Sequence, residues 1–176
     1  MGHTFVLDNH LKTKDMDTFL VLAVQCTFSL LVFFLIFKWY LIPKITKETK
    51  YDVLALLLLV NVFRYLPLSL FLPGQVAAEF PDYLKETIAY GDFLAGILAL
   101  IALLLLKSKK RSAIAYTWLF SVVSILDMVV VLTLAMKEKV YELPLGANYF
   151  TVSVYVPLLI VSQTVILKIL THKMYK

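Results

Sequence analysis

Five long stretches of apolar residues follow one another along the chain, separated by short polar links. A helix needs about 20 residues to cross the roughly 30 Å hydrocarbon core of a bilayer, because it rises about 1.5 Å per residue. The stretches that qualify are residues 18–40, 52–72, 87–106, 112–136 and 148–170. They show no strand-like alternation, and backbone in lipid must form its hydrogen bonds internally. The pattern predicts an all-α fold, a polytopic transmembrane helical bundle of five transmembrane helices in a single domain, 1–176.

The ends of the stretches carry helix-breaking residues. Pro43 follows the first stretch, and the pair Pro73–Gly74 ends the second. An alternative has four spans, with the first or the fifth stretch lying on the membrane surface, but neither has the charged face of an interfacial helix. The first seventeen residues lack the basic start and cleavage site of a signal peptide. We therefore expect the first stretch to be a retained helix.

Charges in the links predict the orientation of the helices. Basic residues gather after the first, third and fifth stretches, at Lys44, Lys47 and Lys50, then Lys107, Lys109, Lys110 and Arg111, then His172, Lys173 and Lys176. The two other links are acidic or balanced. Because basic loops remain in the cytoplasm, we expect the arrangement N-out/C-in. We expect the plasma (inner) membrane rather than an organelle membrane.

Composition narrows the chemistry further. Hydrophobic residues make up 61% of the 176 residues and charged residues 16%, whereas about 25% are charged in a soluble domain. The net charge of +5 lies in links beside apolar stretches, which indicates contact with membrane lipids and not with nucleic acid. Cys26 is the single cysteine and the three histidines lie outside the stretches. We therefore expect no metal site and no cofactor.

Three charged residues are clear cases of ionisable groups deep inside the apolar stretches, where such groups are costly and usually mark a cavity or pathway. They are Arg64 in the second stretch, Asp92 in the third and Asp127 in the fourth. Counting along each helix places Arg64 roughly 18 Å and Asp127 roughly 22 Å from the cytoplasmic side, and Asp92 roughly 7 Å below the outer surface. All three are therefore expected in the outer half of the bilayer, where opposite charges would offset one another's burial.

Polar residues recur at helical spacing beside these charges. Residues three or four apart share a helix face, so the polar stripes of four or five helices predict a chamber that opens to the outside. Besides the three charged residues, the ligand-binding candidates are Asn61, Tyr65, Ser124, Ser153 and Tyr155. A structural alternative stays open, because small polar residues often hold membrane helices together and a buried Arg–Asp pair can be purely structural. Pro67 and Pro157 are expected to kink their helices.

Short motifs in the last four stretches resemble the EXPERA group of four-helix membrane proteins, which includes sterol Δ8–Δ7 isomerase and the sigma-2 receptor. Residues 152–160, VSVYVPLLI, are similar to a Ser-Val-Tyr-x-Pro segment in the last helix of that receptor. Residues 91–94, GDFL, and 65–71, YLPLSLF, resemble the second helix and the end of the first. The resemblance implies that Asp92 faces a ligand. The chain departs from it in having Leu72, Pro73 and Gly74 where the receptor has a second acid, and in lacking a membrane histidine. Isomerase activity is therefore in doubt.

Together these observations favour a membrane-embedded binding protein for a hydrophobic, sterol-like or amine-bearing small molecule, with a polar cavity in the outer half of the bilayer. One alternative is a lipid or sterol double-bond isomerase with Asp92 as proton donor and Asp127 as acceptor. Another is a small transporter or an accessory subunit in which Arg64 and the aspartates lock helices. The expected partners are membrane lipids and the hydrophobic ligand, with no nucleic acid, and the sequence is compatible with a homo-oligomer.

Overall fold

The structure is built from helices. The computed structural model describes residues 2–46 and 49–171, with side chains for residues 18–46 and 49–171, and no strand occurs among them. The α-helices are α1 (Gly2–Ile36), α2 (Lys50–Val62), α3 (Asp82–Lys107), α4 (Ala113–Lys137), the short α5 (Asn148–Phe150) and α6 (Val156–Thr171). Segments of other winding are η1 (Phe37–Leu41), η2 (Ile42–Lys44), η3 (Phe63–Phe71), η4 (Val140–Glu142) and η5 (Thr151–Tyr155). The predicted all-α class is confirmed.

Five helical segments are long and apolar enough to cross a membrane, as the sequence predicted. They are Thr18–Lys44, Lys50–Phe71, Asp82–Lys107, Ala113–Lys137 and Asn148–Thr171. The third helix extends beyond the predicted apolar stretch of residues 87–106, because it begins at Asp82, directly after Pro81. Asp82 favours a helix start here, because an acidic side chain stabilises the first turn of a helix. This first turn is polar, so it was not part of the predicted apolar stretch. Among the basic residues used to predict orientation, Lys47, His172, Lys173 and Lys176 lie outside the described residues.

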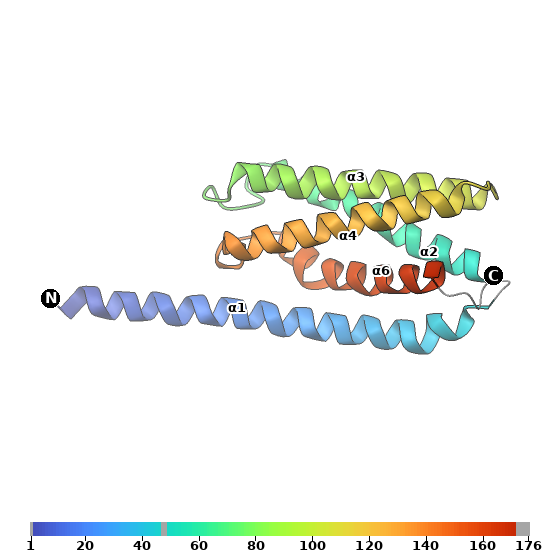
Figure 1. Ribbon diagram of the computed structural model, residues 1–176. Helices are drawn as coiled ribbons and strands as arrows, with labels where there is room; N and C mark the ends of the chain where they lie inside the picture. The colour runs from blue at the N-terminus through green and yellow to red at the C-terminus, as the bar shows by residue number, and fades with distance from the viewer. Residues whose placement is uncertain (1, 47–48, 172–176) are drawn as a thin grey trace.

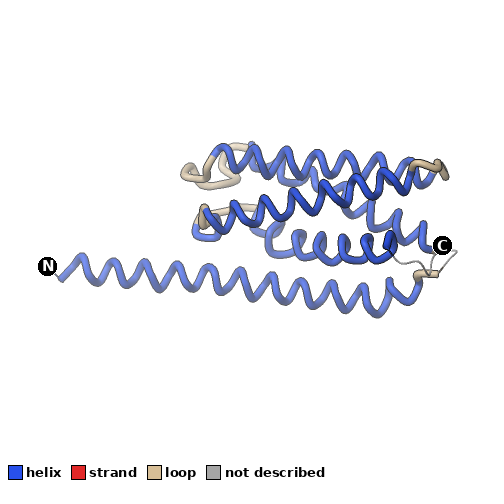
Figure 2. Tube along the Cα trace, viewed as in Figure 1, coloured by secondary structure: helices blue, strands red, loops and turns tan. Residues whose placement is uncertain are grey.

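The long helices run side by side (Figure 1). Helix α3 packs against α2 and α4, and α6 packs against α2 and α1. The links that follow η3 and α4 lie at one end of the bundle, and the short turn between α3 and α4 lies at the other (Figure 2). The alternation of ends follows from the short links, which leave successive helices antiparallel.

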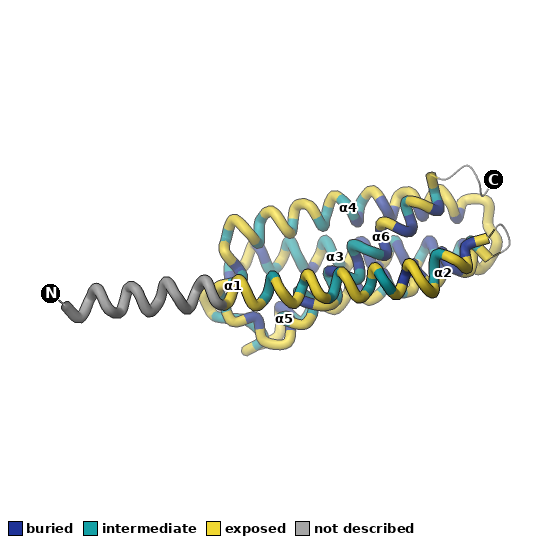
Figure 3. The backbone as a smooth tube through the Cα atoms, turned by 90° about the horizontal axis from the view of Figure 1, so that it is seen from below, coloured by how far each residue is buried: buried dark blue, intermediate teal, exposed yellow. Residues whose placement is uncertain are grey.

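A core of large and small apolar side chains holds α2 and α3 together. Leu54 and Leu58 of α2 are fully buried, as are Ala95 and Ala99 of α3 and Phe120 of α4. Alanines at this spacing let the α2 backbone approach α3 closely. Many positions along the long helices are exposed (Figure 3), and large apolar residues are among them. A surface of this kind is typical of a partner other than water, lipid above all.

The helical winding changes at both positions where a kink was predicted. A proline lacks an N–H, and its ring crowds the carbonyl group four residues earlier. For Pro67 that residue is Phe63, where the 3₁₀ segment η3 begins. For Pro157 it is Ser153, in the middle of the π-helical segment η5. Long 3₁₀ runs and π-turns are uncommon and often occur at functional sites, and both of these adjoin the cluster described next.

Candidate functional site

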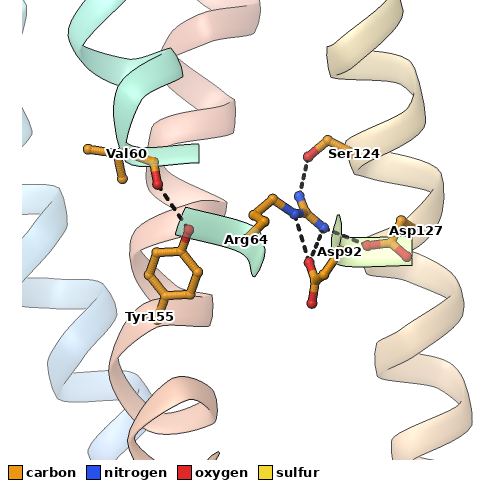
Figure 4. Close-up of polar contacts among 6 residues, drawn as sticks. All are labelled: Val60, Arg64, Asp92, Ser124, Asp127 and Tyr155. Carbon is orange, nitrogen blue, oxygen red and sulfur yellow. Dashed lines mark hydrogen bonds and ion pairs between the residues drawn. The ribbon is translucent and has the colours of Figure 1, made fainter. Parts of the chain in front are cut away.

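Arg64 lies at the centre of a buried polar cluster contributed by three elements. Its side chain extends from η3, where the residue is only 1% exposed. The guanidinium Nε donates to Asp92 Oδ1 of α3 at 2.7 Å, and Nη2 forms an ion pair with the same oxygen at 2.7 Å. Nη2 also donates to Asp127 Oδ2 of α4 at 2.5 Å, and Nη1 donates to Ser124 Oγ at 2.5 Å (Figure 4). The structure thus brings the three predicted charges into direct contact.

The charges in this cluster do not balance. One guanidinium faces two carboxylates, so the cluster carries one net negative charge when both acids are ionised. The carboxylate side chains are nearly buried, with exposed fractions of 15% for Asp92 and 10% for Asp127. Arg64 contacts one oxygen of each acid, Asp92 Oδ1 and Asp127 Oδ2. An unneutralised charge in apolar surroundings is costly, so the cluster is neutral only when one acid is protonated or a further cation joins it.

Two glycines of α3 make room for the cluster. A Cβ built on Gly91 would overlap the Asp127 carboxylate, so the carboxylate lies directly against the α3 backbone. A Cβ on Gly96 would lie 3.2 Å from the carbonyl oxygen of Val62 and 3.6 Å from Arg64 Cβ. Gly91 was not among the residues predicted for the site. A signal was available, because a glycine inside a helical pattern costs about 1 kcal/mol and usually has a packing reason.

The irregular segments η3 and η5 meet beside the cluster. Tyr155, the last residue of η5, donates its hydroxyl hydrogen to the carbonyl oxygen of Val60 at 2.9 Å (Figure 4). Val60 stands four residues before Arg64, and its carbonyl group is one that regular α-helix would bond to the Arg64 N–H. Tyr155 therefore stabilises α2 at the turn where its winding tightens into η3.

A small cavity adjoins the cluster. Its volume is about 30 Å³, and a buried water needs about 10–15 Å³ measured in this way. It is partly open and is lined by Arg64, Asp92, Asp127, Met128, Val131, Leu132, Thr151, Tyr155, Val156 and Leu159. Apart from the cluster, these residues come from α4 and from η5 and α6. The sequence predicted a chamber lined by polar stripes, whereas half of the residues that line this cavity are apolar.

The remaining predicted site residues, Asn61, Tyr65 and Ser153, lie outside the Arg64 cluster. Asn61 donates to Ser162 Oγ of α6 at 3.1 Å and to the carbonyl oxygen of Leu57, so it joins α2 to α6 away from the cavity lining. Tyr65 is exposed and packs beside Phe63, with ring centroids 6.0 Å apart. Ser153 is buried outside the cavity lining.

Asp92 lies ten residues from the start of α3 at Asp82, which corresponds to roughly 15 Å of helix. No group of three His, Cys, Asp or Glu side chains that could hold a metal ion occurs in the described part of the chain.

Comparison with known families gives one match. The family described as a domain of unknown function (DUF8737) matches residues 21–171. This range contains all the residues of the Arg64 cluster and extends from α1 to the end of α6. Neither the curated proteins nor the solved structures contain a match to the chain.

Proposed function

This chain belongs to the DUF8737 family, a domain of unknown function, and we propose that it is a membrane-embedded binding protein for a hydrophobic small molecule that carries an amine. The excess negative charge of the Arg64 cluster supports the proposal, because two carboxylates share one guanidinium beside a cavity. A protonated amine neutralises that charge and donates charge-assisted hydrogen bonds, which are roughly twice as strong as neutral ones.

The cavity volume sets how the ligand lies. About 30 Å³ accommodates an ammonium group but no ring system. The apolar body of the ligand therefore lies outside the cavity, against the side chains at the α4–α6 opening, among them Met128, Leu132 and Val156. A sterol-like body fits this arrangement only along the outer surfaces of α4 and α6. The proposed relation to the EXPERA group rests on the same place, because Asp92 and Tyr155 both line this cavity.

We place the bundle across the plasma (inner) membrane with its N-terminus outside. Support comes from the basic residues, because Lys44 and the run from Lys107 to Arg111 line two hollows that share Asp52 and so lie at the same end of the bundle. A cytoplasmic position for this end follows from the preference for basic loops inside. The Arg64 cluster then lies toward the outer side.

The proposal is tested with purified protein and a pair of probes that differ only in charge. Tetradecylamine is expected to raise the melting temperature, and tetradecanol is not. A ligand at one hundred times its Kd stabilises by about 2.7 kcal/mol, which is a shift of roughly 5–10 °C for a chain of this length. Asp92→Asn and Asp127→Asn each neutralise the cluster, so each variant is expected to lose the amine-specific shift.

Asp82→Asn is the matched control, because it makes the same chemical change at an exposed residue of α3 that pairs with Lys85. This variant should keep the full response to the amine. Equal amine shifts in wild type, Asp92→Asn and Asp127→Asn would refute the role of the carboxylates. An equal response to amine and alcohol would refute recognition of charge.

A second candidate is a small transporter or accessory subunit in which the cluster only locks helices together. The observation that favours it is the number of elements that Arg64 joins, since it connects η3 to both α3 and α4. In that case Asp92→Ala and Asp127→Ala lower stability or assembly while amine and alcohol give the same shift in every variant. The isomerase alternative has less support, because Arg64 donates to both Asp92 and Asp127 and so engages both acids that would exchange a proton with the substrate.

A further inference from the structure

A basic hollow lies at the end of the bundle opposite the links that follow η3 and α4. Its volume is about 690 Å³, and it lies between the first turn of α2 and the turn that joins α3 to α4. Among the described residues, the cations that line it are Lys107, Lys109, Lys110 and Arg111, and the one carboxylate is Asp52. Four positive charges against one negative charge leave a net charge of +3.

The backbone of the α3–α4 turn holds these cations together. Lys109 has a positive φ of 53°, which a residue with a side chain rarely adopts. Its N–H donates to the carbonyl oxygen of Leu106, and the N–H of Lys110 donates to that of Leu105. The chain therefore reverses within a few residues and presents its basic side chains at one place. Lys107 Nζ lies 3.4 Å from Asp52 Oδ1, which fixes one cation across the hollow.

An apolar groove adjoins the basic hollow. It has a volume of about 510 Å³ and lies between α2 and the end of the first helix at η1. Phe37, Leu56 and Val60 are among its lining residues, and Asp52 borders both the groove and the basic hollow. An apolar groove suited to an acyl chain thus adjoins a basic hollow suited to an anion, at the same end of the bundle.

We propose that this composite site binds an anionic phospholipid, with the headgroup phosphate in the basic hollow and an acyl chain in the adjoining groove. The charges select an anion, and a phosphate accepts several hydrogen bonds from lysine and arginine side chains. The length and apolar character of the helices place their ends at the level of lipid headgroups. A free phosphate ion would occupy only the basic hollow, whereas a phospholipid would also place an acyl chain in the apolar groove. The groove therefore favours a phospholipid over free phosphate as the ligand.

The test compares lipid retention by the full-length protein in nanodiscs of phosphatidylcholine with and without phosphatidylglycerol. Each basic residue near an anionic headgroup strengthens binding roughly fivefold, so the variant K109Q/K110Q/R111Q is expected to retain on the order of a hundredfold less phosphatidylglycerol. Native mass spectrometry measures the bound lipid. The control K85Q/K137Q/K139Q removes the same charge from the other end of the bundle and should retain lipid as wild type does. It matches closely, since Lys139 has a left-handed φ of 50° like that of Lys109.

Two further arms keep the result interpretable if the triple variant folds poorly. Asp52→Asn raises the positive charge of the hollow and should increase retention of phosphatidylglycerol. Leu56→Trp fills the groove, so it should lower retention of the lipid while leaving the binding of inorganic phosphate unchanged. Equal loss in the two triple variants, or no gain with Asp52→Asn, overturns the site. Stabilisation by inorganic phosphate equal to that by phosphatidylglycerol, unaffected by Leu56→Trp, overturns the lipid as the source.

Discussion

Replacing Arg64 and replacing either aspartate should have unequal consequences, because the cluster carries more negative than positive charge. In Arg64→Met the two carboxylates of Asp92 and Asp127 remain buried without their shared cation. Removing one partner of a buried ion pair costs about 3–5 kcal/mol. In Asp127→Asn the remaining carboxylate still neutralises Arg64, and the amide oxygen still accepts a hydrogen bond from Nη2. We therefore expect Asp127→Asn to change stability by less than about 1 kcal/mol.

The difference is large enough to measure on purified protein. A change of 1 kcal/mol moves the melting temperature of a chain of this length by about 2–4 °C. Arg64→Met should therefore lower the melting temperature by roughly 6–20 °C, and Asp127→Asn should shift it by less than about 4 °C. The assay heats the protein in detergent and measures the fraction that still elutes as a single species. Arg111→Met is the matched control, because it removes an exposed arginine and should change stability by less than about 0.5 kcal/mol.

A combined variant separates charge from packing. When Arg64→Met is joined to Asp92→Asn and Asp127→Asn, the cluster contains no charge, and most of the lost stability should return. Replacing all members of a buried ionic group is often neutral or stabilising. The reasoning is refuted if Arg64→Met leaves the melting temperature within about 3 °C of wild type, or if Asp127→Asn is as damaging as Arg64→Met. In either case the net charge of the cluster does not control its stability.

Three other changes test the neighbourhood of the cluster. Gly91→Ala should destabilise by about 1–3 kcal/mol, because the new methyl group overlaps the Asp127 carboxylate; thermal unfolding of Gly91→Ala in an Asp127→Ala background should show a smaller cost, and an equal cost would contradict the contact. Tyr155→Phe leaves the carbonyl group of Val60 without its donor and should cost about 1–3 kcal/mol by the same measurement; an unchanged melting temperature would mean that the bond does not stabilise η3. Gln163→Leu should raise the melting temperature by about 2–6 °C, because neither polar atom of this buried side chain has a partner; a decrease would mean that water or another group satisfies the amide.

The five apolar segments and the meeting of the three charges were predictable for the same physical reason. Lipid cannot satisfy an open backbone, so length and hydropathy alone identify the helices. Burying a charged side chain inside such a helix costs free energy, so opposite charges on neighbouring helices are expected to pair. Arg64, Asp92 and Asp127 could therefore be assigned to one site although they stand on three separate segments of the chain.

The details that depend on packing could not be predicted in this way. Asn61 and Tyr65 share a helical stripe with Arg64, yet Asn61 joins α2 to α6 and Tyr65 is exposed. The spacing alone did not predict that the helix tightens to 3₁₀ winding at Phe63, where three residues per turn replace 3.6. Pro67 predicted that the helix is distorted but not that the distortion is a 3₁₀ segment. In the sequence Gly91 stands out only as the residue before Asp92. Its role in making room for the Asp127 carboxylate depends on how closely α4 approaches α3.

Charge and volume together restrict the ligand more than either does alone. The net negative charge at Arg64, Asp92 and Asp127 favours a cation of any size, and on its own it would admit a metal ion, a proton or an amine. The cavity holds about 30 Å³, which excludes a ring system from the charged site but admits an ammonium group. Its lining includes apolar side chains of α4 and α6, among them Met128 and Leu132 of α4. These side chains offer nothing to a hydrated ion and have favourable contacts for a hydrocarbon body, so the proposed ligand, an amine on an apolar molecule, is compatible with all three features.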